Sequence, residues 1–401
     1  MGSSDRVRVL VPARPSAPPD ALSSAGDAPA PACVRAALGA DGVRRLGRRP
    51  ALDGFRGLAV LLVIFDHAHL PLRAAWIGVD LFFVLSGFLI TSLLLDEAAR
   101  TGGIALRGFY ARRARRILPA LALLTLGVAA VSLTAHQLQD RWPLWEQAAA
   151  TWTFAANAVV WLGGAPLGAF TATWSLACEE QFYLLWPLVL RGALRRGRGR
   201  DRGPGRLLVL LLAAAVVLAA AGWAVSASGV APSADVFFNP LERGAELLLG
   251  CALAVAWRHR LLPRALEEAS TRVALLALAG LGVLAWRAPL GTQGTYLLAA
   301  VCSALVLHGL LGERPGALAA AFSFRPLRYT GTVSYGLYLY NDAVSRLLHH
   351  NLPGRGWPVI APLLIAGSFA CAAVSYRYVE VRFLRRRRPQ QAARQDALAP
   401  A

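Results

Sequence analysis

The feature that most constrains this fold is a series of apolar runs, each about as long as a bilayer is thick. A transmembrane helix needs about 20 consecutive, mainly apolar residues. Ten runs approach this length, and short polar segments separate them: 52–70, 76–95, 117–135, 174–191, 207–228, 241–257, 273–288, 295–311, 330–348 and 358–380. We therefore predict an all-α, polytopic bundle of about ten transmembrane helices in a lipid bilayer.

The composition excludes several other classes of protein. Hydrophobic residues make up 56% of the 401 residues and charged residues only 16%, so we expect no large soluble domain. The net charge of +19 does not indicate a nucleic-acid partner, because the arginines lie between apolar runs and not on a soluble face. We expect no metal site and no disulfide, because the five cysteines are scattered without a CxxC pair.

Arginine placement predicts the orientation of the chain. Short cytoplasmic loops are rich in Lys and Arg, and here every second connection is basic, starting before the first run. Both termini are therefore predicted to be cytosolic, in a multi-pass protein of the plasma membrane. The apolar stretch 148–162 would break this alternation as an eleventh span, so we interpret it as re-entrant or interfacial.

Three segments follow from the same pattern. Residues 1–50 are rich in Ala, Pro, Gly and Arg, and we expect a disordered cytosolic tail. Residues 51–388 form the membrane domain, and residues 389–401 form a second short cytosolic tail.

The first apolar run contains Arg56 and His67, and such ionisable residues cost at least about 2 to 3 kcal/mol within a membrane. Eleven helical steps of about 100° bring the two side chains to within about 20° of one face, about 16 Å apart. The fourth run opens with Glu179 and Glu180, at about the predicted depth of His67. Glu179 could support an imidazole base, whereas we interpret Glu180 as a helix cap at the interface.

Five blocks of sequence occur in order along the chain. They are Arg56-x10-His67; residues 78–90, with Asp80 and Ser86; residues 109–119, with Arg113-x-x-Arg116; Trp174-Ser175-Leu176 followed by Glu179, Gln181, Phe182 and Tyr183; and Arg243-x-x-Glu246. Together they resemble the motifs of membrane acyltransferase family 3, whose members acylate bacterial surface glycans and some macrolides. The resemblance covers about residues 50 to 388.

This resemblance implies an O-acyltransferase that moves an acyl group, expected to be acetyl, from cytosolic acyl-CoA to a sugar hydroxyl of an envelope polysaccharide or a macrolide-type metabolite. His67 would be the general base or would carry the acyl group itself, and Glu179 would orient it or balance its positive charge. Basic side chains would bind the donor's CoA: Arg56, Arg113 and Arg116. Other residues would shape the site: Asp80, Ser86, Trp174, Tyr183, Arg243, Glu246 and Asn341.

Asn341 marks a departure from the family. The sequence Ser334-Tyr335-Gly336-Leu337-Tyr338-Leu339-Tyr340-Asn341 resembles an aromatic family motif that usually ends in histidine. Asn341 takes the place of that histidine, which argues against a second catalytic imidazole here.

Plainer interpretations remain open for these residues. Any one arginine of the 112–116 cluster could be an ordinary positive-inside residue, and Arg56 could anchor its helix at the headgroups. Ten spans with buried charges could also make a transporter for a lipid-linked or small glycosylated solute. Neither a paired internal repeat nor a matched pair of broken helices supports that alternative.

Overall fold

The computed structural model describes residues 43–70, 76–135, 142–163, 166–196, 203–228, 236–287, 294–312 and 316–385. Both predicted tails lie almost entirely outside these residues. Every regular element in the described part of the chain is a helix and none is a strand, which confirms the all-α fold class. Its helices are α2 (Pro50–His67), α3 (Ile77–Thr101), α4 (Leu106–Ala135), α5 (Leu144–Trp152), α6 (Ala156–Gly163), η1 (Gly168–Phe170), α7 (Thr173–Arg196), α8 (Pro204–Ala227), η2 (Val236–Phe238), α9 (Pro240–Arg258), α10 (Arg264–Glu268), α11 (Ser270–Arg287), α12 (Thr295–Leu310), α13 (Ala317–Phe322), α14 (Arg325–Thr332), α15 (Ser334–Asn351), α16 (Trp357–Val374), η3 (Ser375–Glu380) and α17 (Val381–Arg385).

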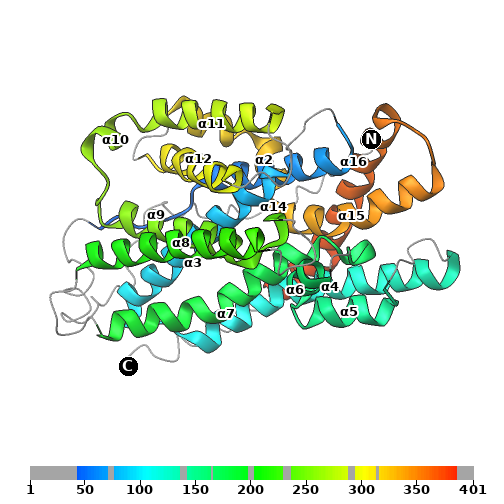
Figure 1. The fold of residues 1–401 in the computed structure, drawn as a ribbon, viewed down its shortest axis with the longest axis horizontal. Helices are drawn as coiled ribbons and strands as arrows, with labels where there is room; N and C mark the ends of the chain where they lie inside the picture. Colours follow the sequence, from blue (N-terminus) through cyan, green and yellow to red (C-terminus); the bar gives the residue numbers. More distant parts are fainter. Residues whose placement is uncertain are drawn as a thin grey trace, which may run out of the picture.

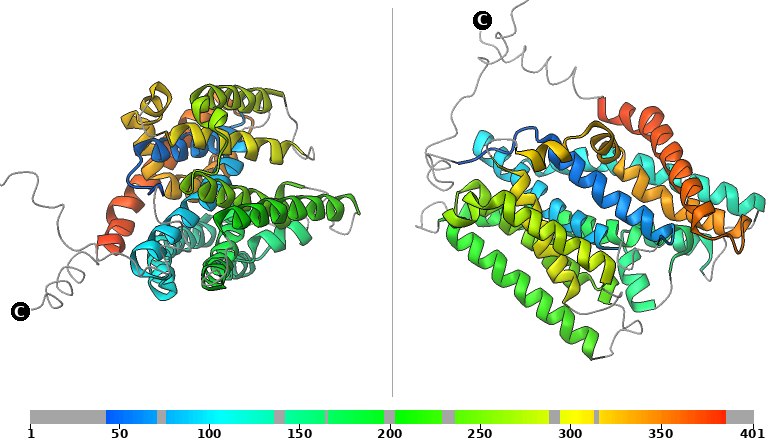
Figure 2. Two further views of the ribbon diagram at one scale, coloured as in Figure 1. Left: turned by 90° about the vertical axis from the view of Figure 1, so that its left-hand side faces the viewer. Right: turned by 90° about the horizontal axis from the view of Figure 1, so that it is seen from above.

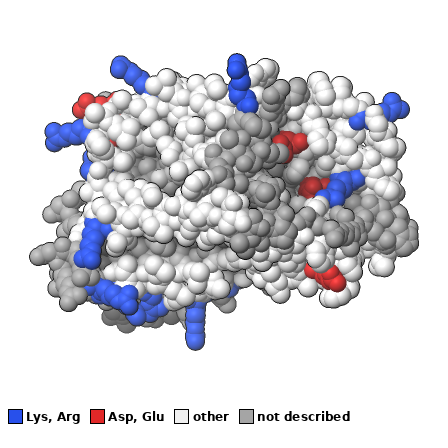
Figure 3. All heavy atoms as spheres, viewed as in Figure 1, with Lys and Arg blue, Asp and Glu red and all other residues white. Residues whose placement is uncertain are grey.

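The helices form one bundle (Figures 1 and 2). Figure 1 shows α11 and α12 along one side and α4 and α7 along the other, with α3, α8 and α9 between them. The broad face in Figure 3 is largely free of charge in its middle, and many of the arginines visible there lie towards its left end and lower edge. A broad uncharged surface is what lipid contact requires of a membrane helix bundle.

Five helical segments are long and apolar enough to cross a bilayer: Ile77–Thr101, Leu106–Leu133, Pro204–Ala227, Ser270–Arg287 and Trp357–Leu384. The shorter apolar helix Thr295–Leu310 accompanies them. Helices α2, α7, α9 and α15 coincide with other predicted runs, but each contains several charged side chains. The chain is therefore a multi-pass helical membrane protein, whereas ten spans and two cytosolic termini stay predictions.

The basic segment after the second span is helical, and its prediction as a loop was wrong. Helix α4 begins at Leu106, eleven residues before the predicted start of that span at residue 117. Arginine and alanine are good helix formers, and an excess of positive charge says nothing about backbone conformation. The helix places Arg113 and Arg116 one turn apart on neighbouring surface positions.

The stretch 148–162 is not one continuous helix. It falls on the two short helices α5 and α6, and the turn between them contains Phe154 at a φ of 53°. Helices of 9 and 8 residues are each only about 12 to 14 Å long, too short to cross about 30 Å of hydrocarbon. This geometry agrees with the interpretation of the stretch as re-entrant or interfacial.

Glycines allow the central helices to touch backbone to backbone. A Cβ atom on Gly87 of α3 would lie 1.9 Å from the Leu247 carbonyl oxygen of α9, and one on Gly250 would lie 2.1 Å from that of Val84. Helices α2 and α14 meet in the same way, since a Cβ on Gly331 of α14 would lie 1.7 Å from the Asp53 carbonyl oxygen of α2. Small residues at such contacts are typical of helix packing in membranes.

Candidate active site

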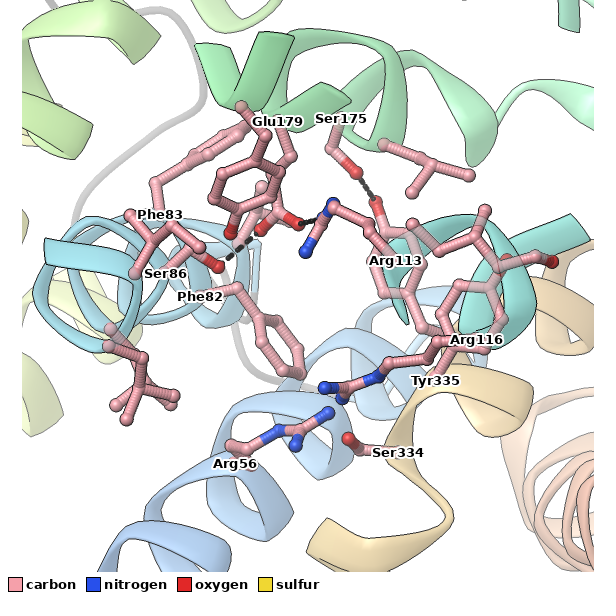
Figure 4. A pocket seen from close by; sticks show the side chains of 18 of the residues that line it. Arg56, Phe82, Phe83, Ser86, Arg113, Arg116, Ser175, Glu179, Ser334 and Tyr335 are labelled. Atoms are coloured by element: carbon pink, nitrogen blue, oxygen red, sulfur yellow. Dashed lines mark hydrogen bonds and ion pairs between the residues drawn. The ribbon is translucent and has the colours of Figure 1, made fainter. Parts of the chain in front are cut away.

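A cavity of about 170 Å³ lies between α2, α3, α4, α7 and α15 (Figure 4). The α3 residues that line it run from Val79 to Leu93. Fourteen helical steps correspond to about 21 Å along the axis, so the cavity follows α3 through much of the bundle. Its other lining includes charged and hydroxyl side chains from four elements: Arg56, Arg113, Arg116, Ser175, Glu179, Tyr183, Ser334, Tyr335 and Tyr338.

One wall of the cavity is a hydrogen-bonded chain of polar groups. Ser86 donates to Glu179 Oε1 over 2.6 Å, and Arg113 Nη2 lies 3.6 Å from Glu179 Oε2. Arg113 Nε donates to Glu180 Oε1 over 2.6 Å, and its guanidinium lies 3.4 Å from the centre of the Tyr183 ring. The interpretation of Glu180 as an interfacial cap was wrong. Both carboxylates lie inside α7 and contact Arg113 of α4.

The opposite wall contains two arginines without a carboxylate. Figure 4 shows the guanidinium groups of Arg56 and Arg116 facing one another beside Ser334. Within the described residues, neither arginine forms an ion pair. Two facing cations repel each other unless an anion lies between them, so this wall is suited to an anionic group such as a phosphate.

His67 lies at the other end of α2 and does not line this cavity. Its Nδ1 is hydrogen-bonded to the side-chain oxygen of Asn341 on α15. His67 and Glu179, both of which are described, share no hydrogen bond: Asn341 contacts the His67 ring, and Ser86 and Arg113 contact Glu179. Asn341 Nδ2 donates to the carbonyl oxygen of Tyr338, whose hydroxyl is bonded to Ser175 in the cavity wall. His67 is therefore linked through α15 to one end of the cavity.

A second cluster of charge is completely buried beside the cavity. Arg243 Nη1 lies 2.5 Å from Asp80 Oδ1 and 2.5 Å from Glu246 Oε1, and all three side chains are at most 2% exposed. Its guanidinium carbon lies within 6 Å of four ring centres, those of Phe83, Trp174, Phe237 and Tyr296. Asp80 and Trp174 therefore surround Arg243 and do not line the cavity, whereas Ser86 and Tyr183 do line it.

Sequence reasoning missed several cavity residues. Ser175 and Tyr338 form a hydrogen bond across the wall at 2.5 Å, and Ser334 and Tyr335 line it nearby. The only available signal was that these residues fall within the quoted sequence blocks, because Ser175 follows Trp174 and the other three belong to the aromatic segment. The ion pair between Asp96 and Arg258 gave no signal in the sequence, because the two residues are 162 positions apart.

The fold and this cavity define a class, namely an integral membrane protein of many helices whose polar, arginine-lined cavity lies inside the bundle. The sequence profile of the acyltransferase domain family matches residues 49–377, so the chain belongs to that family. No solved structure matches the chain significantly.

Curated relatives agree with the family assignment. The chain is 32% identical over 355 residues to the peptidoglycan O-acetyltransferase OatA of Listeria monocytogenes, covering 82% of this chain and 55% of the relative. It is 29% identical over 351 residues to the O-acetyltransferase OatA of Staphylococcus aureus, covering 82% of this chain and 56% of the relative. The chain thus spans about half the length of the curated relatives it matches.

Proposed function

We propose that this protein is an O-acyltransferase of the plasma membrane that moves an acetyl group from cytosolic acetyl-CoA to a sugar hydroxyl of an envelope polysaccharide. The observation that carries this proposal is the arginine-lined cavity. Arg56 and Arg116 face each other without a carboxylate partner among the described residues, while Arg113 is held by Glu179 and Glu180.

The donor is proposed from the chemistry of this wall. CoA carries several phosphate groups, and arginine binds phosphate through two parallel hydrogen bonds. With the orientation predicted from the basic loops, Arg113 and Arg116 lie on the cytosolic half of α4. The length of the cavity along α3 then allows the thioester end of the donor to extend towards the outer half of the bundle.

The reaction centre is proposed at His67. In one route Nε2 takes the proton of the acceptor hydroxyl while its oxygen attacks the thioester carbonyl, and in the other Nε2 attacks that carbonyl and carries the acyl group. Ser86, Glu179 and Tyr183 would line the path of the acyl group. The described residues contain no group of three His, Cys, Asp or Glu placed to hold a metal ion, and neither route needs one.

The acceptor is proposed from the relatives, since the Listeria relative is named for O-acetylation of peptidoglycan. A hydroxyl on an envelope sugar matches that name. Secreted glycosylated metabolites such as macrolides are the alternative acceptors, and the experiment below includes them.

The experiment compares cells that contain the wild type, His67→Ala or His350→Ala at equal membrane levels. His350 is exposed on the last turn of α15 and serves as the matched control. Mass spectrometry of cell-wall glycans and secreted glycosylated metabolites should show an acetylated species with the wild type and with His350→Ala but not with His67→Ala. The species that shifts identifies the acceptor, and the mass difference identifies the acyl group.

A different result would reject the proposal. Acylation could be the same in all three strains while His67→Ala alone changes the distribution of a solute across the membrane. The protein would then be a transporter, and the transferase proposal would be wrong.

A further inference from the structure

Asn341 is completely buried on α15, and all of its hydrogen-bonding directions can be assigned. Its Nδ2 amide group donates to two carbonyl oxygens of its own helix, those of Leu337 at 3.1 Å and Tyr338 at 2.6 Å. The remaining atom, Oδ1, faces His67 Nδ1. An amide oxygen only accepts hydrogen bonds, so the hydrogen between these two atoms belongs to the imidazole.

From this geometry we infer that Asn341 is a positioning residue that holds His67 in the tautomer protonated on Nδ1. A neutral imidazole has one N–H group and one lone pair. With the hydrogen on Nδ1, the lone pair lies on Nε2, which has no hydrogen-bond partner among the described residues. The inference rests on the proposed function only in taking His67 as the reacting group.

A second contact from the same helix fixes the backbone beneath the ring. Ser345, four residues after Asn341, donates its hydroxyl to the His67 carbonyl oxygen over 3.2 Å. His67 is the last residue of α2, where helix carbonyls lack partners within their own helix. One face of α15 therefore holds both the ring and the main chain of His67, which restricts the direction of the Nε2 lone pair.

Both proposed routes need that lone pair. In the first, the bond from the hydroxyl oxygen to the acyl carbon forms, the carbon–sulfur bond breaks, and Nε2 passes the hydroxyl proton to the departing thiolate. In the second, a bond from Nε2 to the acyl carbon replaces the carbon–sulfur bond and CoA leaves as a thiolate; the acceptor oxygen later displaces Nε2, which takes the hydroxyl proton and passes it to the thiolate. The opposite tautomer has a hydrogen on Nε2 and cannot begin either route.

Several titratable groups surround this position, and the test has to separate their effects from that of Asn341. Asp66 precedes His67 on α2 and His69 follows it, and the His69 ring centre lies 5.1 Å from that of His349 on α15. Asp342 on α15 lies 3.5 Å from Arg346. None of these groups takes the place of Asn341 at Nδ1.

The direct test reads the tautomer. The wild type and His67→Gln, each labelled with ¹⁵N in its histidines, are placed in lipid nanodiscs, and the resonances lost in the variant are those of His67. In the neutral ring we expect a protonated Nδ1 and an unprotonated Nε2. A neutral ring protonated on Nε2 in the wild type would overturn the inference, whether or not the protein transfers acyl groups.

The kinetic test uses two variants with membrane level and melting temperature as controls for folding. Asn341→Leu removes the acceptor, and we expect kcat to fall about tenfold or more with KM unchanged. Asn341→Asp keeps an acceptor but adds a charge that favours the imidazolium, so the acidic limb of the pH profile should move to higher pH. If Asn341→Leu does not fold, the pH profile of Asn341→Asp and the ¹⁵N spectrum of the wild type still test the inference.

Two outcomes distinguish the inference from the proposed function. If His67→Ala abolishes transfer but folded Asn341→Leu keeps the wild-type rate and pH profile, Asn341 does not position the ring and the inference is wrong. If His67→Ala transfers acetyl at the wild-type rate, the proposed role of His67 is wrong, although the ¹⁵N spectrum still decides the tautomer.

Discussion

Arg113 and Arg243 each lie between two carboxylates, yet their surroundings differ. Arg243, with Asp80 and Glu246, is fully buried among four aromatic rings. Arg113 keeps 18% of its side-chain surface exposed, stacks on one tyrosine ring and lines a cavity. The comparison separates a cation that the fold encloses from one that a ligand can reach.

Burial determines what each arginine can do. Removing one partner from a buried ion pair leaves an uncompensated charge, which is far more costly than the loss of an exposed pair. Arg243 belongs to α9 and its partner Asp80 to α3, so this ion pair should hold the two helices together. Arg113 should contribute less to stability and more to ligand binding.

The largest effect is expected from Arg243→Met. It would leave Asp80 and Glu246 facing each other in a dry core, and we expect a loss of about 3 to 5 kcal/mol in unfolding free energy. Thermal unfolding of detergent-solubilised protein measures this loss. Arg355→Met, at an exposed position, is the control and should melt like the wild type. Equal melting of the two variants would show that the buried cluster is not structural.

Arg113→Gln should instead preserve folding and weaken donor use. A hydrogen bond to a charged group contributes about 1.5 to 3 kcal/mol, so we expect kcat/KM for acetyl-CoA to fall about 10- to 100-fold. Inside-out vesicles with labelled acetyl-CoA measure this change. Arg112→Gln is the neighbouring control, since Arg112 is exposed and pairs with Glu97 at 3.2 Å, away from the cavity. A similar loss of kcat/KM in both variants would show that Arg113 has no special role in donor binding.

Ser86→Ala tests the hydrogen bond to Glu179 alone. Loss of one hydrogen bond costs about 1 kcal/mol, which corresponds to about a fivefold lower rate of acetyl transfer. Ser92→Ala is a control on the same helix, because the Ser92 hydroxyl is buried and has no hydrogen-bond partner within the described part of the chain. If Ser92→Ala reduces the rate as much as Ser86→Ala does, the effect comes from α3 packing and not from Glu179.

The smallest effect is expected at an arginine–carboxylate pair on the surface. Arg44 donates to Glu267 at 2.8 and 3.1 Å, and this hydrogen bond lowers the pKa of Glu267 below its ordinary 4.5. A depressed pKa adds stability above the unfolded-state pKa, and that stability is lost as the pH falls through the folded-state pKa. Glu267→Gln should cost at most about 1 kcal/mol at pH 7 and less at pH 3. A cost that stays the same at both values would contradict an electrostatic origin.

Sequence periodicity predicted helices well and side-chain partners poorly. The spacing of Arg56 and His67 correctly placed both on one helix, but only Arg56 lines the cavity. His67 is held by Asn341, which is 274 positions away, and no local pattern could indicate that contact. The rule for basic loops found the arginines of α4 but not their helical backbone. Glu179 and Glu180 were assigned different roles, although both contact one arginine on a helix whose position the sequence did not reveal.

The close approach of Gly87 on α3 to the backbone of α9 bears on the size of any group that the cavity could hold. Ser86 lines the cavity, and the next residue, Gly87, presses against the backbone of α9. The α3 wall therefore cannot retreat without separating two helices that already touch through their main chains. If the protein is the proposed acyltransferase, a variant that accepts a bulkier acyl group should have to gain its space from side chains of α2, α4, α7 or α15. The α3 wall would then be the fixed limit on acyl-chain length, and the side chains of the other helices the adjustable one.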